Sequence, residues 1–227
     1  MAINSMLIAK EFSVLKKQVL CYSALSLLAI AIIAIPHKTA GLLGSILQCT
    51  VMIAFYCHIT IKSVISEVKE KNHALWLGLP ITPNQVQLTK LLSLWVIFFT
   101  LWLPFLGLTL AAILSNPYWS AVGPAFYVFG FSLYLPAFAL ILTSAFITRS
   151  EAITIFVLVC TNLGVTMMLN LIPQADEISQ AFAAGNIMEA GLIWPALLIK
   201  LSIISVSICA GLMLVTVLQL RRSKVVI

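Results

Sequence analysis

The residues that could perform chemistry in the apolar part of this chain are few, and their spacing does not form a catalytic centre. Cys57 and His58 are adjacent, and neighbouring side chains on a helix point about 100° apart, so the imidazole is badly placed to activate the thiol. The three histidines lie in different regions, and no H-E-x-x-H zinc motif occurs. We therefore expect neither catalytic residues nor metal ligands in this chain, and an intramembrane enzyme is a disfavoured alternative.

A polar segment points instead to contact with a partner protein. Residues 67–90 form a strongly polar stretch inside an otherwise apolar chain. Val68, Leu75 and Leu79 would share a narrow arc if the first part of this stretch were helical. The spacing predicts a short amphipathic helix on the cytoplasmic side of a membrane.

This predicted helix must end near Leu79. Pro80 disfavours helical geometry in the preceding residue and cannot donate a backbone hydrogen bond. Thr82, Pro83 and Gln85 then match the N-cap, N1 and N3 positions of a new helix. The pattern predicts a helix, a sharp turn, and a second helix that continues into the next apolar segment. Docking on a partner is one interpretation of this arrangement, and an ordinary interfacial loop is the alternative.

The composition places these polar residues in a membrane protein. Hydrophobic residues make up 62% of the chain and charged residues 9%, which is too apolar for a soluble surface. A membrane-spanning helix needs about 20 mainly apolar residues. Six segments fit this length: Val19–Pro36, Gly41–Ile65, Leu91–Ser115, Tyr118–Ile147, Ala152–Ile172 and Trp194–Leu220. Because they are continuous apolar runs, the sequence predicts an all-α polytopic membrane protein, with residues 1–227 as one transmembrane domain.

The leader, residues 1–18, is amphipathic. On a helix, its apolar side chains share one face and two lysines lie opposite: Ile8, Phe12 and Leu15 against Lys10 and Lys17. We expect an interfacial helix that lies flat on the inner membrane surface. A simple basic anchor that sets the topology is the alternative.

The distribution of basic residues predicts the orientation, because positive charges near span ends stay in the cytoplasm. With both termini inside, eleven of the thirteen basic residues are cytoplasmic: Lys10, Lys16, Lys17, Lys62, Lys69, Lys71, Lys90, Arg149, Arg221, Arg222 and Lys224. Residues 173–193 contain acidic residues and no Lys or Arg, which suits an exterior segment. The net charge of +6 therefore indicates contact with the lipids of an inner membrane, and it is no argument for nucleic-acid binding.

Polar side chains within the spans are candidates for contact with a transported substrate. They are Tyr56 and His58 in the second span and Asn162 and Asn170 in the fifth. A hydrogen bond between packed helices is the alternative for His58 and Asn162. All Asp and Glu residues lie outside the predicted span cores, which disfavours an ion-coupled secondary transporter. A membrane anchor or assembly protein without transport stays open.

Several residues of the polar segment form a recognisable pattern. They are Glu67, Glu70–Lys71, Leu77, the run Leu79–Pro80–Ile81, Val86 and Lys90–Leu91–Leu92. The pattern is similar to the segment between spans two and three of type-2 ATP-binding-cassette (ABC) exporter permeases, which have acidic residues, a Leu-Pro-hydrophobic turn and a Lys-Leu-Leu start to span three. The resemblance extends more loosely to the amphipathic leader, the six spans and the cytoplasmic termini.

The resemblance implies a permease subunit of an ATP-driven exporter that pairs with a second copy or a similar permease. No G-x-x-x-x-G-K-[ST] phosphate loop occurs, so ATP and Mg would bind to a separate ABC ATPase subunit, with no cofactor in this chain. A coupling helix within residues 66–90 would dock on that subunit. The coupling residues that the resemblance implies are Glu67, Val68, Glu70, Lys71, Leu75, Trp76, Leu79 and Pro80, with Arg149 and Glu151 in a second contact. The resemblance also places the substrate path at a dimer interface lined by spans two and five.

Two of these assignments have simpler explanations in the sequence. Ser150 can cap the fifth span and Glu151 complements the positive end of its dipole, so capping explains this turn as well as partner contact does. Trp76 could anchor at the lipid interface, where tryptophan is enriched.

Overall fold

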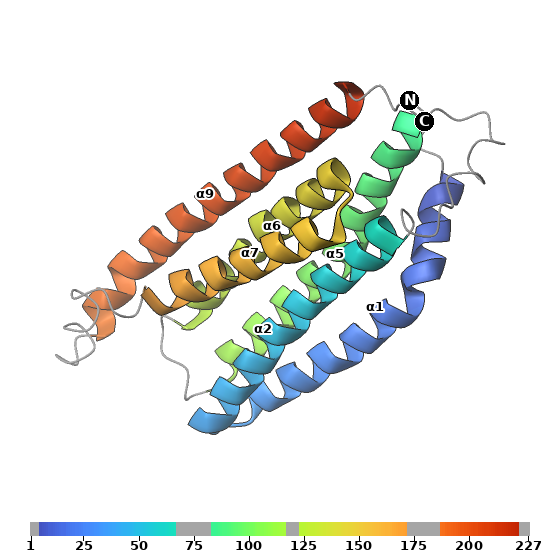
Figure 1. Cartoon of the computed structure of the whole chain (residues 1–227). Coiled ribbons are helices and arrows are strands. Elements are labelled where there is room, and N and C mark those ends of the chain that lie inside the picture. The colour runs from blue at the N-terminus through green and yellow to red at the C-terminus, as the bar shows by residue number, and fades with distance from the viewer. Residues whose placement is uncertain (1–4, 67–82, 117–122, 172–186, 223–227) are drawn as a thin grey trace.

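The computed structural model describes residues 5–66, 83–116, 123–171 and 187–222, and within these ranges the chain is helical apart from short turns (Figure 1). The helices are α1 (Ser5–Ala34), α2 (Lys38–Thr60), the π-helical turn η1 (Ile61–Ile65), α5 (Pro83–Leu114), α6 (Gly123–Thr148), α7 (Glu151–Leu171) and α9 (Ile187–Arg222). The described ranges contain no strand, and the predicted all-α fold class is confirmed for them.

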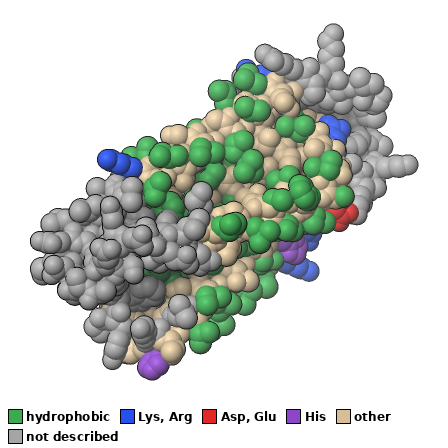
Figure 2. All heavy atoms as spheres, turned by 60° about the vertical axis from the view of Figure 1, so that its left-hand side comes forward, with side chains coloured by type: hydrophobic (Ala, Val, Ile, Leu, Met, Phe, Trp, Pro, Cys, Tyr) green, Lys and Arg blue, Asp and Glu red, His purple; other side chains and the backbone are tan. Residues whose placement is uncertain are grey.

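Five of the described helices are long and apolar enough to cross a membrane. The stretches are Ala9–Ala34, Thr39–Ile65, Gln85–Leu114, Tyr127–Thr148 and Ile199–Arg221, and α7 adds a shorter apolar stretch, Glu151–Met167. In the most apolar 18-residue stretch of α1, and likewise of α9, only 17% of the residues are buried. Most apolar side chains of these two helices therefore face outward, as contact with lipid requires. Figure 2 shows hydrophobic side chains spread over the described part of one face, with charged side chains toward its ends. The chain is therefore a multi-pass membrane protein.

The helices run side by side along one axis and alternate in direction (Figure 1). α1 packs against α2 and α5, and α6 packs against α7 and α9, while α6 also contacts α2 and α5. The N-terminal ends of α1, α5 and α7 and the C-terminal ends of η1, α6 and α9 lie together, at the upper right of Figure 1. We call this end of the bundle the basic end, because it carries Lys10, Lys16, Lys17, Lys62, Lys90, Arg149, Arg221 and Arg222.

Aromatic side chains fill the contact between α5 and α6. The rings of Phe98 and Phe138 stack with centroids 4.4 Å apart, and Trp95 meets Phe138 edge-on at 5.0 Å. The buried Trp102 indole N–H donates to the carbonyl of Phe131 at 3.0 Å, which satisfies its polar group. Aromatic pairs of this geometry contribute about 0.5–1.5 kcal/mol beyond the area they bury. Together with its contacts to α2, α7 and α9, these aromatic pairs make α6 the central helix of the bundle.

The leader is not a separate element in the structure. α1 runs continuously from Ser5 to Ala34, so no break separates residues 5–18 from the first span. Leu15 is completely buried and Phe12 packs against the same core. Phe12 and Leu15 of the predicted stripe therefore pack against other helices of the bundle, which supply the apolar surface that we expected the membrane to provide.

α1 and α2 approach each other closely at Gly44. An added Cβ at this residue would lie 2.8 Å from the carbonyl oxygen of Ala29 and 2.7 Å from a side-chain carbon of Ile33. At the same end of the bundle, the buried Asn116 amide donates to the carbonyls of Ile33 and Ile35, at 2.9 and 3.0 Å. The end of α1 is thus fixed by a glycine contact and by a side-chain cap from Asn116, the second residue after α5.

Other helix boundaries differ from the predicted ones in detail. α5 begins at Pro83, which confirms a helix start at this proline and its continuation into the third span. α9 begins at Ile187, so residues 187–193 of the predicted exterior segment 173–193 are helical. The second span ends at Ile65 as predicted, but its last turn is a π-helix that the apolar pattern did not reveal.

Candidate functional site

The turn between α6 and α7 lies at the basic end. Arg149 closes α6 with a positive φ of 51°, a left-handed conformation that is uncommon outside glycine. Ser150 follows, and its hydroxyl oxygen accepts a hydrogen bond from the N–H of Ile153 at 3.5 Å. Glu151 is the first residue of α7, where its carboxylate complements the helix dipole. The predicted capping of the fifth span is confirmed.

The same turn presents polar side chains at the surface of the basic end. Arg149 is exposed, and Ser150 and Glu151 are partly exposed. A two-residue connection between helices holds these groups in fixed positions at the end of the bundle. Capping and partner contact are therefore compatible at this turn.

The predicted coupling helix is outside the described residues. Its assigned residues are Glu67, Val68, Glu70, Lys71, Leu75, Trp76, Leu79 and Pro80. The structure does describe the two helix ends that flank them, Ser66 after η1 and Pro83 at the start of α5, and both lie at the basic end (Figure 1).

A buried ionic contact joins α1 to both of these helix ends. The carboxylate of Glu11 accepts a hydrogen bond from the hydroxyl of Ser63 in η1 at 2.9 Å. Its other oxygen lies 3.9 Å from the ammonium nitrogen of Lys90 in α5. Neither Glu11 nor Ser63 is among the site residues predicted from the sequence. The available signal was the position of Glu11 on the same helical face as Leu15, four residues later, where an apolar residue is expected.

Tyr56 and Asn162, two of the predicted path residues, meet inside the bundle. Tyr56 in α2 is completely buried, and its hydroxyl donates to the side-chain oxygen of Asn162 in α7. The Tyr56 ring also lies 6.3 Å from the rings of Tyr134 and Phe138 in α6. The pair therefore links the second and fifth spans, with the central helix beside it.

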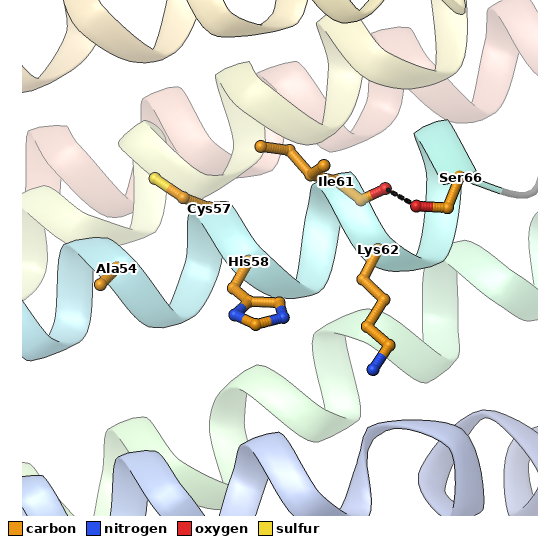
Figure 3. A pocket seen from close by; sticks show the side chains of 6 residues that line it. All are labelled: Ala54, Cys57, His58, Ile61, Lys62 and Ser66. Carbon is orange, nitrogen blue, oxygen red and sulfur yellow. Dashed lines mark hydrogen bonds between the residues drawn. The ribbon is translucent and has the colours of Figure 1, made fainter. Parts of the chain in front are cut away.

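His58 lies on a different face of α2. It is exposed and lines an open groove of about 570 Å³, together with Ala54, Cys57, Ile61, Lys62 and Ser66. In Figure 3, His58 and Lys62 project from one side of the helix, and Cys57 and Ile61 from the other. His58 Nδ1 is 3.1 Å from the hydroxyl of Tyr22 in α1, which is a helix-packing contact. Side chains two residues apart on a helix point about 200° apart. Tyr56 and His58 of the same chain therefore cannot line the same substrate path.

The fourth path candidate, Asn170, belongs to the last turn of α7, where the structure describes the backbone but not this side chain. Among the described residues, no group of three His, Cys, Asp or Glu side chains could hold a metal ion. Of the four predicted path residues, the structure thus brings only Tyr56 and Asn162 together.

Comparison with protein families decides the class of this bundle. A family model described as ABC-2 family transporter protein matches residues 6–216, which is nearly the whole chain. The chain belongs to the ABC-2 transporter family. Comparisons with curated proteins and with solved structures gave no match. Members of the ABC-2 membrane family are transport permeases that are not themselves catalytic, and the resemblance found in the polar segment is confirmed at the level of the family.

Proposed function

We propose that this ABC-2 protein is the membrane-spanning permease of an ATP-driven exporter, which moves a hydrophobic or amphipathic substrate across the inner membrane. The observation that carries the proposal is the family match over residues 6–216. The sequence has no phosphate loop of its own. ATP and Mg therefore bind to a separate ABC ATPase subunit, and the permease converts the movements of that subunit into transport.

The proposal includes six spans with both termini in the cytoplasm. α7 has 21 residues, which corresponds to about 30 Å of helix and is enough to cross a hydrocarbon core. Six antiparallel spans return the C-terminal end of α9 to the side where α1 begins, in agreement with Figure 1. The basic end is the cytoplasmic one, because Lys and Arg near span ends are retained there.

The coupling surface combines the α6–α7 turn with residues 67–82. Ser66, Pro83 and Arg149 all belong to the basic end, so a single partner beneath the bundle can reach both regions (Figure 1). In this arrangement Arg149 and Glu151 form the second contact with the ATPase subunit, beside the contact made by the coupling helix.

A second permease copy, or a similar permease, completes the transporter. We place the shared interface along α2 and α7, because the pair Tyr56–Asn162 joins these helices. α7 also presents exposed apolar side chains along its length: Ile153, Ile155, Phe156, Val159, Leu163 and Met167. Closure of the two ATPase subunits would rock the permeases between inward and outward states.

One observation favours an ion-coupled secondary transporter as a second candidate. Glu11 lies within the apolar stretch Ala9–Ala34 and is 9% exposed, and intramembrane carboxylates are typical of such transporters. However, Ser63 donates to this carboxylate and Lys90 lies 3.9 Å away, so the carboxylate is held by contacts between helices of the bundle. The exporter remains the better explanation.

Purification from the native host in a mild detergent tests the function. We expect a stoichiometric ABC ATPase subunit to accompany the tagged permease, identified by mass spectrometry, with vanadate-sensitive ATP hydrolysis. Recovery of the permease without any ATPase, reproduced in lipid nanodiscs, would contradict the proposal and favour a secondary transporter or an anchor protein.

A double-mutant cycle at Tyr56 and Asn162 separates helix packing from substrate contact. Tyr56→Phe and Asn162→Leu are each expected to destabilise the permease in a detergent unfolding assay, with a coupling free energy of about 0.6–2 kcal/mol, as for other interhelical hydrogen bonds in membranes. Additive effects on unfolding, accompanied by altered transport in Tyr56→Phe, would mean that the hydroxyl acts on the substrate instead.

A further inference from the structure

One carboxylate contacts both helix ends that flank residues 67–82. Glu11 of α1 accepts a hydrogen bond from Ser63, three residues before Ser66, at 2.9 Å. Its other oxygen lies 3.9 Å from the ammonium nitrogen of Lys90, which is seven residues after Pro83 at the start of α5. The three side chains are buried, with 9% or less of each residue exposed. Three helical segments of the basic end therefore meet at a single carboxylate.

The hydroxyl of Ser63 behaves differently from its neighbours in the same helix. Thr60 donates to the carbonyl of Tyr56 four residues earlier, and Ser66 donates to Ile61 five residues earlier. Ser63 instead donates to another helix. It lies inside the π-helical turn Ile61–Ile65, and such turns shift the helical register by one residue and are frequent at functional sites. The local distortion and the contact with Glu11 thus coincide.

The energetics of this contact favour positioning over stability. Removing two charges from water costs free energy that their mutual attraction only partly returns, so a buried ion pair is a weak source of net stability. Such a pair does restrict geometry, because a charge displaced from its partner is left buried and uncompensated. The contact therefore fixes how α1, η1 and α5 sit relative to one another at the basic end.

We propose that Glu11 is a positioning residue for energy coupling: through Ser63 and Lys90 it holds together the two helix ends from which residues 67–82 leave the bundle. A displacement of these residues by the ATPase subunit is then delivered to α1, α2 and α5 as a unit. This inference rests on the proposed exporter function. Without the contact, the two ends move independently and part of the displacement is lost.

The test uses the complex of the permease with its ATPase subunit in lipid nanodiscs. The measured quantity is the rate of ATP hydrolysis in the complex relative to the ATPase subunit alone. Glu11→Gln removes the charge but keeps an oxygen that can accept from Ser63, and the double variant Glu11→Lys with Lys90→Glu reverses the pair. Lys16→Gln is the matched control, because it removes one charge from an exposed side chain of the same helix.

We expect Glu11→Gln to lower this ratio about tenfold, within the usual range of coupling between sites, while the amount of bound ATPase subunit and the melting temperature change little. The reversed pair should restore most of the ratio, and Lys16→Gln should leave it unchanged. A Glu11→Gln complex with the wild-type ratio would overturn the inference. A lost ratio that follows loss of the bound subunit or of stability, and that the reversed pair does not restore, would also overturn it. Absence of any ATPase from the wild-type preparation would instead refute the exporter function.

Discussion

Replacing Gly44 with alanine is expected to destabilise the permease by about 1–3 kcal/mol, the usual cost of overpacking a close contact. The added Cβ would lie 2.8 Å from both the carbonyl oxygen of Ala29 and the backbone nitrogen of Ile33. Backbone atoms cannot turn away as a flexible side chain can, so α1 and α2 would have to separate. Valine at the same position should prevent folding, seen as loss of the monodisperse peak in size-exclusion chromatography.

The same substitution elsewhere provides the control. An added Cβ at Gly107 in α5 meets no atom within 4 Å. Alanine normally stabilises an exposed helix relative to glycine by about 0.5–1 kcal/mol, so the sign of the effect should reverse at this position. Equal unfolding free energies for Gly44→Ala and Gly107→Ala, measured in mixed micelles, would show that the helices are not in close contact at Gly44.

The membrane architecture could be predicted because it depends on continuous apolar length, which is visible in the sequence. The helix start at Pro83 and the cap at Ser150 were also predictable, since both follow from local backbone chemistry. The continuous course of α1 was not. The leader's apolar stripe fits a membrane surface and a helix bundle equally well, and only the tertiary packing of Leu15 decides between them.

The candidate site was predictable only in part, for a similar reason. Spans two and five were expected to line one path, and the structure joins Tyr56 to Asn162. The separation of His58 from this pair follows from helical rotation, which the sequence contains once the span is taken as a helix. The contact of Glu11 with Ser63 and Lys90 joins three distant segments, and the π-helical turn beside it has no sequence signature.

Replacing both Leu75 and Leu79 with glutamate is expected to release the ATPase subunit from the permease. In the predicted coupling helix these two leucines occupy the apolar arc that would seat on the partner. Burial of a leucine side chain contributes about 1.5–3 kcal/mol, so loss of both would weaken binding by at least a hundredfold, before the cost of burying charge is added. Insertion should be unaffected, because residues 67–82 lie between the second and third apolar segments of the sequence. Mass spectrometry of the purified permease should detect the partner only at trace levels.

A second double variant makes the test specific to the helical face. His73 and Leu77 lie two residues before Leu75 and Leu79, a rotation of about 200° on a helix, so they occupy the opposite side. His73→Glu with Leu77→Glu adds the same two acidic residues and removes one leucine. Partner recovery should then stay close to the wild-type level. Release of the ATPase subunit by both double variants would indicate that negative charge, and not a seated apolar face, disrupts the contact. Retention by both would exclude residues 67–82 as the docking element and leave the turn at Arg149 and Glu151 as the surface to test.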